Sequence, residues 1–179
     1  ERVAIVGLTG KTPLLETLAV LRVPRQGVLE LDGIDVRGLD RPATRQQIAF
    51  VGRPEVFAGT VADNVRLGRG EVTASRVRQV LDWVGLSDRL ARLPDALETE
   101  LTPDGRPLSN NELSRLAIAR AVVGRPRLLV LDGTLDSLDL SSCPELLDKL
   151  FDRTAGWTLV IATVRDDIRS RCDRVIEWT

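Results

Sequence analysis

The sequence has no histidine, no methionine and no tyrosine, and only 2 of its 179 residues are cysteine. Without histidine the chain has no imidazole general base, no Ser-His-Asp triad and no histidine ligand for a metal. Cys143 and Cys172 lie far apart and belong to no cysteine framework, so neither a zinc site nor a disulfide scaffold is expected. We expect both thiols to be reduced and partly buried, as in a cytosolic protein.

Neither sign of charge dominates, because 25 Lys+Arg oppose 26 Asp+Glu and leave a net charge of -1. This balance predicts no nucleic-acid partner. No apolar run reaches the roughly 18 residues that a membrane-spanning helix needs, and the start of the chain has no signal-peptide pattern. A hydrophobic share of 43% and a charged share of 28% are typical of one globular domain. Because an apolar strand begins almost at once, at Val3, we expect the chain to be a fragment of a longer one.

Apolar runs and helical spacings alternate along the chain. Strands are predicted at residues 3–6, 28–31, 34–36, 48–51, 128–131, 159–162 and 174–178. Helices are predicted at residues 14–21, 61–65, 74–84, 113–123, 144–150 and 166–171. Asp32-Gly33 predicts a hairpin turn, and Thr44 with Gln47 predicts the cap of a further short helix. The pattern predicts an α/β fold with a mainly parallel sheet, an antiparallel hairpin and a helical subdomain at about residues 60–125.

The segment Gly7-Leu8-Thr9-Gly10-Lys11-Thr12 links a predicted strand to a predicted helix, as a phosphate loop does. In such a loop the backbone N–H groups and the helix N-terminus face an anion, the lysine adds positive charge and the threonine hydroxyl faces Mg²⁺. Here two residues separate the glycines, whereas the standard motif has four. Taken alone, the segment is equally compatible with a tight turn that carries a surface lysine.

Polar residues in the second half of the chain add to this pattern. Asp132 ends the apolar run 128–131, and in phosphate-loop ATPases such an aspartate holds Mg²⁺. Ser109-Asn110-Asn111-Glu112 precedes a helical segment that includes Arg120, which is expected to be a charge at the helix C-terminus. Ser109 and Glu112 also form a capping box, which would start a helix whether or not a nucleotide binds.

In order, these segments resemble the ATP-binding domain of exporter-type ABC transporters. Leu108–Glu112 is similar to the signature loop Leu-Ser-Gly-Gly-Gln, and Phe57–Val65 is similar to Phe-x-Gly-Thr-x-x-Glu-Asn-Ile. Ser137-Leu138-Asp139 matches the end of the D-loop. The resemblance covers residues 1–179 and implies a P-loop NTPase core that binds ATP and Mg²⁺. It also implies a transmembrane domain on the same or a partner chain, a second ABC ATPase domain, and a place on the cytoplasmic face of the cell membrane.

The resemblance implies specific site residues and shows where the chain departs from the family. Nucleotide contacts would come from Gly7, Leu8, Thr9, Gly10, Lys11, Thr12, Pro13, Ser109, Asn110 and Asn111, and metal ligands from Thr12 and Asp132. Gly133 stands at the position of the catalytic glutamate, Val164 at that of the switch histidine, and Gly52 or Arg53 at that of the Q-loop glutamine. Substitution of the family's acid by Asp136 or Asp139 is an alternative.

Two functions therefore stay open. The first is a transporter domain that couples ATP binding to transport, with weak or absent hydrolysis. The second is a pseudo-ATPase that serves as a pairing or regulatory module and binds no nucleotide. Whether the chain is an active enzyme depends on which of the two holds.

Overall fold

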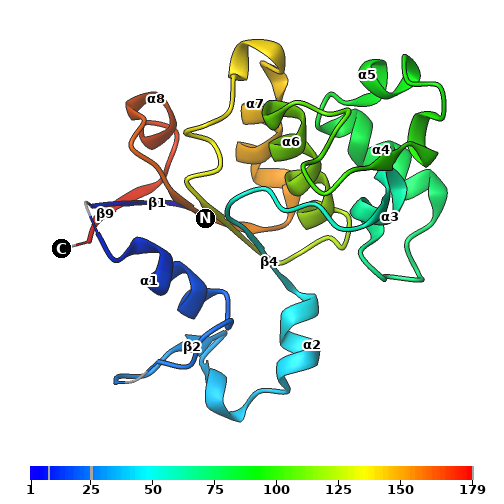
Figure 1. The fold of residues 1–179 in the computed structure, drawn as a ribbon. Coiled ribbons are helices and arrows are strands. Elements are labelled where there is room, and N and C mark those ends of the chain that lie inside the picture. Colours follow the sequence, from blue (N-terminus) through cyan, green and yellow to red (C-terminus); the bar gives the residue numbers. More distant parts are fainter. Residues whose placement is uncertain (8, 25, 179) are drawn as a thin grey trace. The chain divides into compact units, whose positions relative to one another are not determined.

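The computed structural model describes residues 1–7, 9–24 and 26–178, which form two compact units (Figure 1). Unit 1 consists of Glu1–Gly52, Pro126–Asp136 and Gly156–Thr179. Unit 2 consists of Arg53–Arg125 and Ser137–Ala155. Of the predicted phosphate loop, Leu8 lies outside the described residues.

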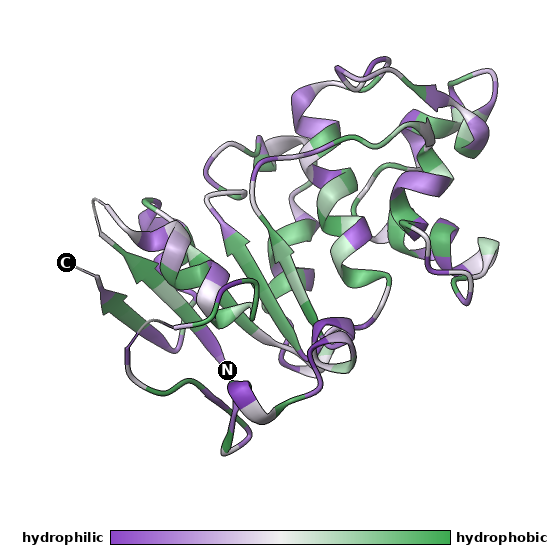
Figure 2. Ribbon diagram, turned by 60° about the horizontal axis from the view of Figure 1, so that its bottom comes forward, coloured by the Kyte–Doolittle hydropathy of each residue, from purple (hydrophilic) through white to green (hydrophobic). Residues whose placement is uncertain are grey.

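Unit 1 is built on a five-stranded sheet in the order β4-β7-β8-β1-β9, in which every neighbouring pair is parallel. Its strands are β1 (Arg2–Val6), β4 (Ile48–Val51), β7 (Leu128–Asp132), β8 (Thr158–Ala162) and β9 (Arg174–Glu177). The three central strands are almost continuously apolar, as Figure 2 shows, because a parallel sheet is buried on both faces. Since all strands run in one direction, the loops after their carboxyl ends meet at one edge of the sheet.

The rest of unit 1 consists of short elements. These are α1 (Lys11–Leu18), the antiparallel pair β2 (Glu30–Leu31) and β3 (Ile34–Asp35), the 3₁₀ turn η1 (Val36–Gly38), α2 (Arg41–Gln46) and α8 (Asp166–Arg169). Helix α1 buries Leu15 against Val3, Ile5 and Val130 of the sheet. This packing fixes the first turn of α1 beside the ends of the central strands.

Unit 2 is mainly helical. It contains α3 (Val61–Arg66), α4 (Ala74–Trp83), α5 (Ser87–Ala91), α6 (Asn110–Val122) and α7 (Glu145–Phe151), the antiparallel pair β5 (Gly59–Thr60) and β6 (Glu100–Leu101), and the 3₁₀ turns η2 (Ala96–Glu98), η3 (Leu140–Ser142) and η4 (Arg153–Ala155). Helix α6 is the centre of the unit, because most of its residues are buried and both α3 and α4 pack against it. In the described part of the chain, no helix has the length and apolar character needed to cross a bilayer.

The predicted fold class, α/β with a mainly parallel sheet and an antiparallel hairpin, is confirmed. One cap is wrong: Asp40 precedes α2, and Thr44 lies inside the helix, where its hydroxyl donates to the carbonyl oxygen of Asp40 at 2.7 Å. The proline in the first turn of α2 explains the earlier start, because its fixed φ suits that position. Helix α5 and the strand pair β5-β6 were not predicted from the sequence. Strands of two residues are too short to give a periodic signal.

Candidate functional site

The loop after β1 ends at Gly10, whose backbone conformation favours glycine over residues that carry a side chain. Gly10 is the N-cap residue of α1 and has a φ of 73°, in the left-handed region. No described side chain caps this helix, and its first turn contains no acidic residue. The N–H groups of that turn are therefore available to an anion, which the helix dipole also favours. Lys11 begins the helix and makes no ion pair with a described residue, so its charge is available too.

Thr12 and Asp132 meet although 120 residues separate them in the sequence. The Thr12 hydroxyl donates a hydrogen bond of 2.5 Å to Oδ2 of Asp132. Helix α1 presents Thr12 from its first turn, and Asp132 is the last residue of β7. The two predicted metal ligands thus lie at one point. A hydroxyl and a carboxylate are hard oxygen donors of the kind Mg²⁺ prefers.

Gly133 follows Asp132 and brings no acid to the site. Its φ is 66°, and its N–H donates to the carbonyl oxygen of Ala162 at 3.1 Å. A Cβ atom added there would have no neighbour within 4 Å. The position that follows Asp132 thus has open space for a side chain, and only the left-handed backbone would resist one.

Val164, the residue predicted at the switch position, is 68% exposed and offers only an aliphatic side chain. The loop itself is held by Asp136, whose carboxylate accepts from the hydroxyl of buried Thr163 and, at 3.2 and 3.3 Å, from the Val164 N–H. Both oxygens of Asp136 are therefore engaged in fixing the loop at residues 163–164. This arrangement favours a structural role for Asp136 over that of a substitute acid.

Asp139 is likewise engaged within its own loop. Its carboxylate accepts from the Ser141 N–H at 3.0 Å and from the Ser141 hydroxyl at 2.6 Å. These hydrogen bonds lower the pKa of Asp139 and make its carboxylate a weaker base, so they favour a role within its own loop over that of a substitute for the family's glutamate.

The Q-loop position lies after β4. The hydroxyl of buried Thr134 donates to the carbonyl oxygens of Val51 at 2.9 Å and Gly52 at 3.3 Å, which ties the end of β4 to the loop after β7. Gly52 contributes no side chain, and Arg53 is exposed and makes no ion pair with a described residue. Neither residue provides the amide group that the family has at this position.

In unit 2 the predicted signature segment forms a helix cap. Ser109 is the N-cap of α6; its hydroxyl accepts from the Glu112 N–H at 3.3 Å, and its own N–H donates to the Glu112 carboxylate at 2.8 Å. Glu112 also pairs with Arg89 at 3.1 Å. The side chain of Asn111 bonds the Asp139 carbonyl oxygen at 3.4 Å and the Ser142 hydroxyl at 3.3 Å. The capping box predicted as the structural alternative is therefore present.

A polar cluster of unit 2 went unpredicted. Asn64 is fully buried and bonds the backbone of Phe57 through both ends of its amide, at 2.8 and 2.9 Å. Arg120 donates to the Asn64 side chain at 2.9 Å and to the Asn64 carbonyl oxygen at 2.7 Å, and its guanidinium lies 4.7 Å from the centre of the Phe57 ring. Burial lowers the pKa of this guanidinium.

Arg120 is thus in the last turn of α6, as expected, but it serves as an internal tie and not as a solvated charge. The sequence contained one signal for the burial of this side chain. Arg120 continues the apolar spacing of Leu113, Leu116 and Ala117, which places it on the buried face of the helix.

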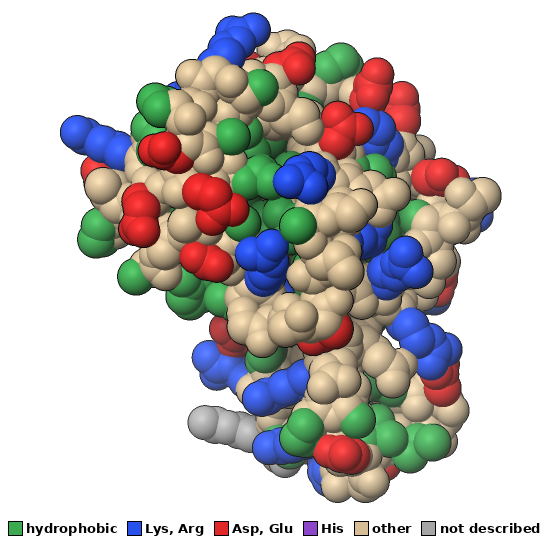
Figure 3. All heavy atoms as spheres, turned by 90° about the vertical axis from the view of Figure 1, so that its right-hand side faces the viewer, with side chains coloured by type: hydrophobic (Ala, Val, Ile, Leu, Met, Phe, Trp, Pro, Cys, Tyr) green, Lys and Arg blue, Asp and Glu red, His purple; other side chains and the backbone are tan. Residues whose placement is uncertain are grey.

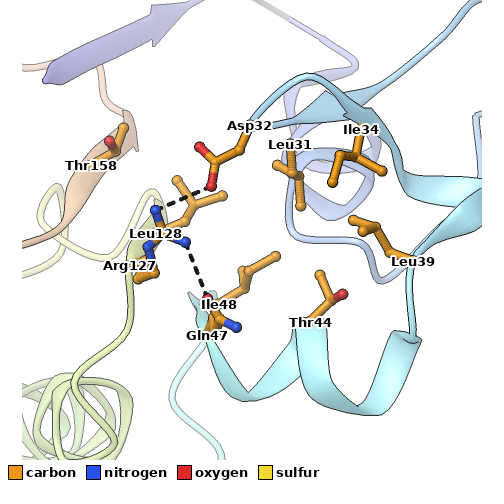
Figure 4. Close-up of a pocket in the computed structure, with 10 residues that line it drawn as sticks. All are labelled: Leu31, Asp32, Ile34, Leu39, Thr44, Gln47, Ile48, Arg127, Leu128 and Thr158. Carbon is orange, nitrogen blue, oxygen red and sulfur yellow. Dashed lines mark hydrogen bonds and ion pairs between the residues drawn. The ribbon is translucent and has the colours of Figure 1, made fainter.

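Unit 1 has a pocket that lies away from the predicted phosphate loop. This pocket of about 370 Å³ is lined by Leu31 and Ile34 of the hairpin, by Thr44 of α2, and by Ile48, Leu128 and Thr158 at the amino ends of β4, β7 and β8 (Figure 4). At its rim Arg127 pairs with Asp32 at 3.1 Å and approaches the Gln47 amide oxygen at 3.5 Å. Because the sheet is parallel, this pocket and the loop after β1 lie at opposite ends of the strands.

Comparisons with known proteins agree with these observations. The sequence pattern of the family described as "ABC transporter" matches residues 1–135. The transport/processing ATP-binding protein ComA of Streptococcus pneumoniae is 31% identical over 98% of the chain, and the ABC multidrug transporter MDR2 of Trichophyton tonsurans is 34% identical over 96%. The chain spans 25% and 13% of these two relatives, so it matches only part of each.

A solved structure gives the same result for the fold. A bacterial Atm1-family ABC exporter with ATP bound is similar to this chain with a TM-score of 0.91 and 26% sequence identity. The match covers 99% of this chain and 32% of the exporter chain.

Proposed function

The chain belongs to the ABC transporter family, and from this premise we propose that it binds ATP with Mg²⁺ and hydrolyses it slowly or not at all. In this proposal residues 1–179 act as one nucleotide-binding domain with a helical subdomain at about 60–125. The observation that carries the proposal is the 2.5 Å contact between the Thr12 hydroxyl and the Asp132 carboxylate. It supplies two oxygen donors beside a helix N-terminus.

These residues fit an ATP–Mg²⁺ complex. The free N–H groups after Gly10, together with Thr9 and the charge of Lys11, would hold phosphate oxygens, while Gly7 and Pro13 bound the loop. Among the described residues, no group of three or more acidic, Cys or His side chains could hold a metal ion. Mg²⁺ at Thr12 and Asp132 would therefore take its further oxygens from phosphate and water, as is usual for this ion. When bound, it neutralises charge on the phosphates.

Slow hydrolysis follows from the two residues that replace the family's reactive groups. Gly133 has no carboxylate to polarise a water molecule, and exposed Val164 has no polar side chain to contact a γ-phosphate. A positioned base contributes about 10²–10⁴-fold to a rate, so losing it reduces turnover without removing the phosphate contacts.

In this proposal transport requires a transmembrane domain, on the same or a partner chain, and a second ABC ATPase domain. We propose that it acts on the cytoplasmic face of the cell membrane, next to a transmembrane domain. Unit 2 has a pocket of about 500 Å³ lined by Pro54, Val56, Phe57 and Leu113 among others, and Phe57 is 41% exposed. The pocket is also lined by Glu55, Asp104 and Asn110, and this mixture of apolar and polar side chains suits a short loop or helix end of the membrane-spanning part. Figure 3 shows that acidic and basic side chains both lie on the surface displayed in this view.

The test measures binding and turnover separately on the full chain. Equilibrium dialysis should detect Mg²⁺-dependent ATP binding that Asp132→Ala weakens, while phosphate release stays far below that of an intact family member. Fast, Mg²⁺-dependent turnover that Asp132→Ala abolishes would refute slow hydrolysis. Absence of ATP binding would refute the proposed site.

A second candidate function rests on the signature segment. Ser109, Asn110 and Asn111 would contact the nucleotide of a second ABC ATPase domain, but the first of them caps α6 and the third bonds the loop after Asp139. Side chains so engaged favour a pairing module that builds no working site. Sedimentation with and without Mg²⁺-ATP tests this: the isolated chain should stay monomeric. An ATP-dependent dimer would contradict the claim that this segment no longer bridges two domains.

A further inference from the structure

Trp178 lies beside the phosphate loop, at the edge of the sheet in unit 1. Strand β9 pairs in parallel with β1, and the Trp178 N–H donates to the carbonyl oxygen of Val6 at 2.7 Å. This bond extends the pairing by one residue past Glu177, the last residue of β9. The backbone of Trp178 is thus fixed next to the point where β1 turns into the loop.

Both glycines of the loop lie directly against this residue. A Cβ atom on Gly7 would overlap the Trp178 carbonyl oxygen, and a Cβ atom on Gly10 would stand 3.1 Å from Nε1 and 3.7 Å from Cδ1 of the indole. The backbone of Trp178 therefore contacts the start of the loop, and its indole contacts the N-cap of α1. The three atoms nearest to the added Cβ of Gly7 all belong to Trp178, and near that of Gly10 Trp178 is the only described residue within 4 Å apart from the chain neighbours.

The indole also borders open space. Trp178 is 39% exposed, and with Thr9 and Val164 it lines a pocket of about 590 Å³. A group that enters this pocket would meet the phosphate loop, the switch position and the indole together.

We propose that Trp178 is a positioning residue for the phosphate loop, an inference that rests on the proposed ATP site. A loop with only two residues between its glycines has little chain with which to brace itself. The indole supplies that support, because a large rigid ring against the N-cap restricts the conformations that the loop can adopt. Loss of the ring should loosen residues 7–12 and weaken phosphate binding.

The first test needs no nucleotide. Amide hydrogen exchange of the peptide that contains residues 7–12 is compared in the wild-type full chain, Trp178→Ala and Trp178→Phe. Exchange should be about tenfold faster in Trp178→Ala and close to wild type in Trp178→Phe, which keeps an aromatic ring. Trp83→Ala makes the same chemical change in unit 2 and should leave this peptide unaffected. Unchanged exchange in Trp178→Ala would overturn the proposal.

The second test reads the site directly. In the double variant Trp83→Phe, Trp157→Phe the only indole is Trp178, so its emission should change when Mg²⁺-ATP is added. Equilibrium dialysis of Trp178→Ala should show affinity for ATP about tenfold weaker, with recovery in Trp178→Phe. ATP binding by the wild type, with unchanged emission and equal affinity in Trp178→Ala, would also overturn the proposal. Faster exchange in Trp178→Ala without any ATP binding by the wild type would support the positioning role and refute the proposed ATP site instead.

Discussion

The loop before α1 and the segment before α6 both lead into a helix, yet they present their polar groups in opposite ways. The first has no side-chain cap among the described residues, so no described side chain satisfies the N–H groups of its first turn. The second has a complete capping box, in which Ser109 and Glu112 satisfy each other's backbone N–H groups. One helix start is open to a ligand, and the other is closed by its own residues.

This difference separates features that serve binding from features that serve the fold. An uncapped helix N-terminus costs stability unless another group or a ligand satisfies it. Such an end beside Lys11, Thr12 and Asp132 is understandable as a phosphate site. A fully capped end is stable without any partner, so α6 gives no such indication.

The largest expected effect is a gain of hydrolysis in Gly133→Glu, Val164→His. The double variant restores a carboxylate and an imidazole where the family has them, and Gly133 has open space for a side chain. Turnover should rise by about 10²-fold, at the low end for a positioned base, because the backbone φ of 66° strains the new residue. Phosphate release measures it. The same double change in an Asp132→Ala background should give no gain. A gain there would mean that Thr12 and Asp132 play no part in hydrolysis.

Removal of the internal tie of unit 2 should have the next largest effect. Asn64→Ala leaves the Phe57 backbone and the Arg120 guanidinium without their buried partner, so the free energy of unfolding should fall by about 2–3 kcal/mol. Urea denaturation measures the loss. Asn110→Ala, on the exposed start of α6, should change stability by less than about 0.5 kcal/mol. Equal losses in the two variants would contradict the assigned role.

Lys11→Ala tests the open helix start. The lysine makes no ion pair with a described residue, so its charge is available to a phosphate, and ATP affinity should fall by about tenfold. Equilibrium dialysis measures it. Lys149→Ala removes a lysine that already pairs with Glu145, and affinity should then be unchanged. An equal fall in both variants would point to nonspecific attraction of the anion.

Ser109→Ala tests the closed helix start. Loss of the cap hydroxyl should lower the free energy of unfolding by about 1 kcal/mol, measured by urea denaturation. Ser109→Asn keeps a capping side chain and should retain most of the stability. If the two variants are equally stable, the hydroxyl contributes nothing as a cap.

The smallest effect concerns the second capping box, on α3. The Thr60 N–H and hydroxyl donate to Asp63 and lower the pKa of its carboxyl. A pKa lowered by folding stabilises the protein above the ordinary value of about 3.9, and this stabilisation disappears as the pH falls through the lowered value. At pH 7 the free energy of unfolding of Asp63→Asn, measured by urea denaturation, should therefore be lower than that of the wild type. The difference should be less than about 1 kcal/mol because the group is exposed. The two should converge in acid; a constant gap would argue against the ionised carboxylate.

The sequence by itself determined the order of the strands and helices other than α5, β5 and β6, the family resemblance and the places where its reactive residues are missing. These properties depend on residue types and short spacings, which local physics fixes. Gly133, Val164 and the capping box of Ser109 and Glu112 are all visible without coordinates.

Only the tertiary structure decided which distant residues meet. The contact of Thr12 with Asp132 depends on the order of strands in a parallel sheet and on how α1 packs against it, and neither is encoded within a short window. The same holds for Asn64 with Arg120 and for Trp178 against Gly10, because burial and edge pairing become defined only when separate elements pack together.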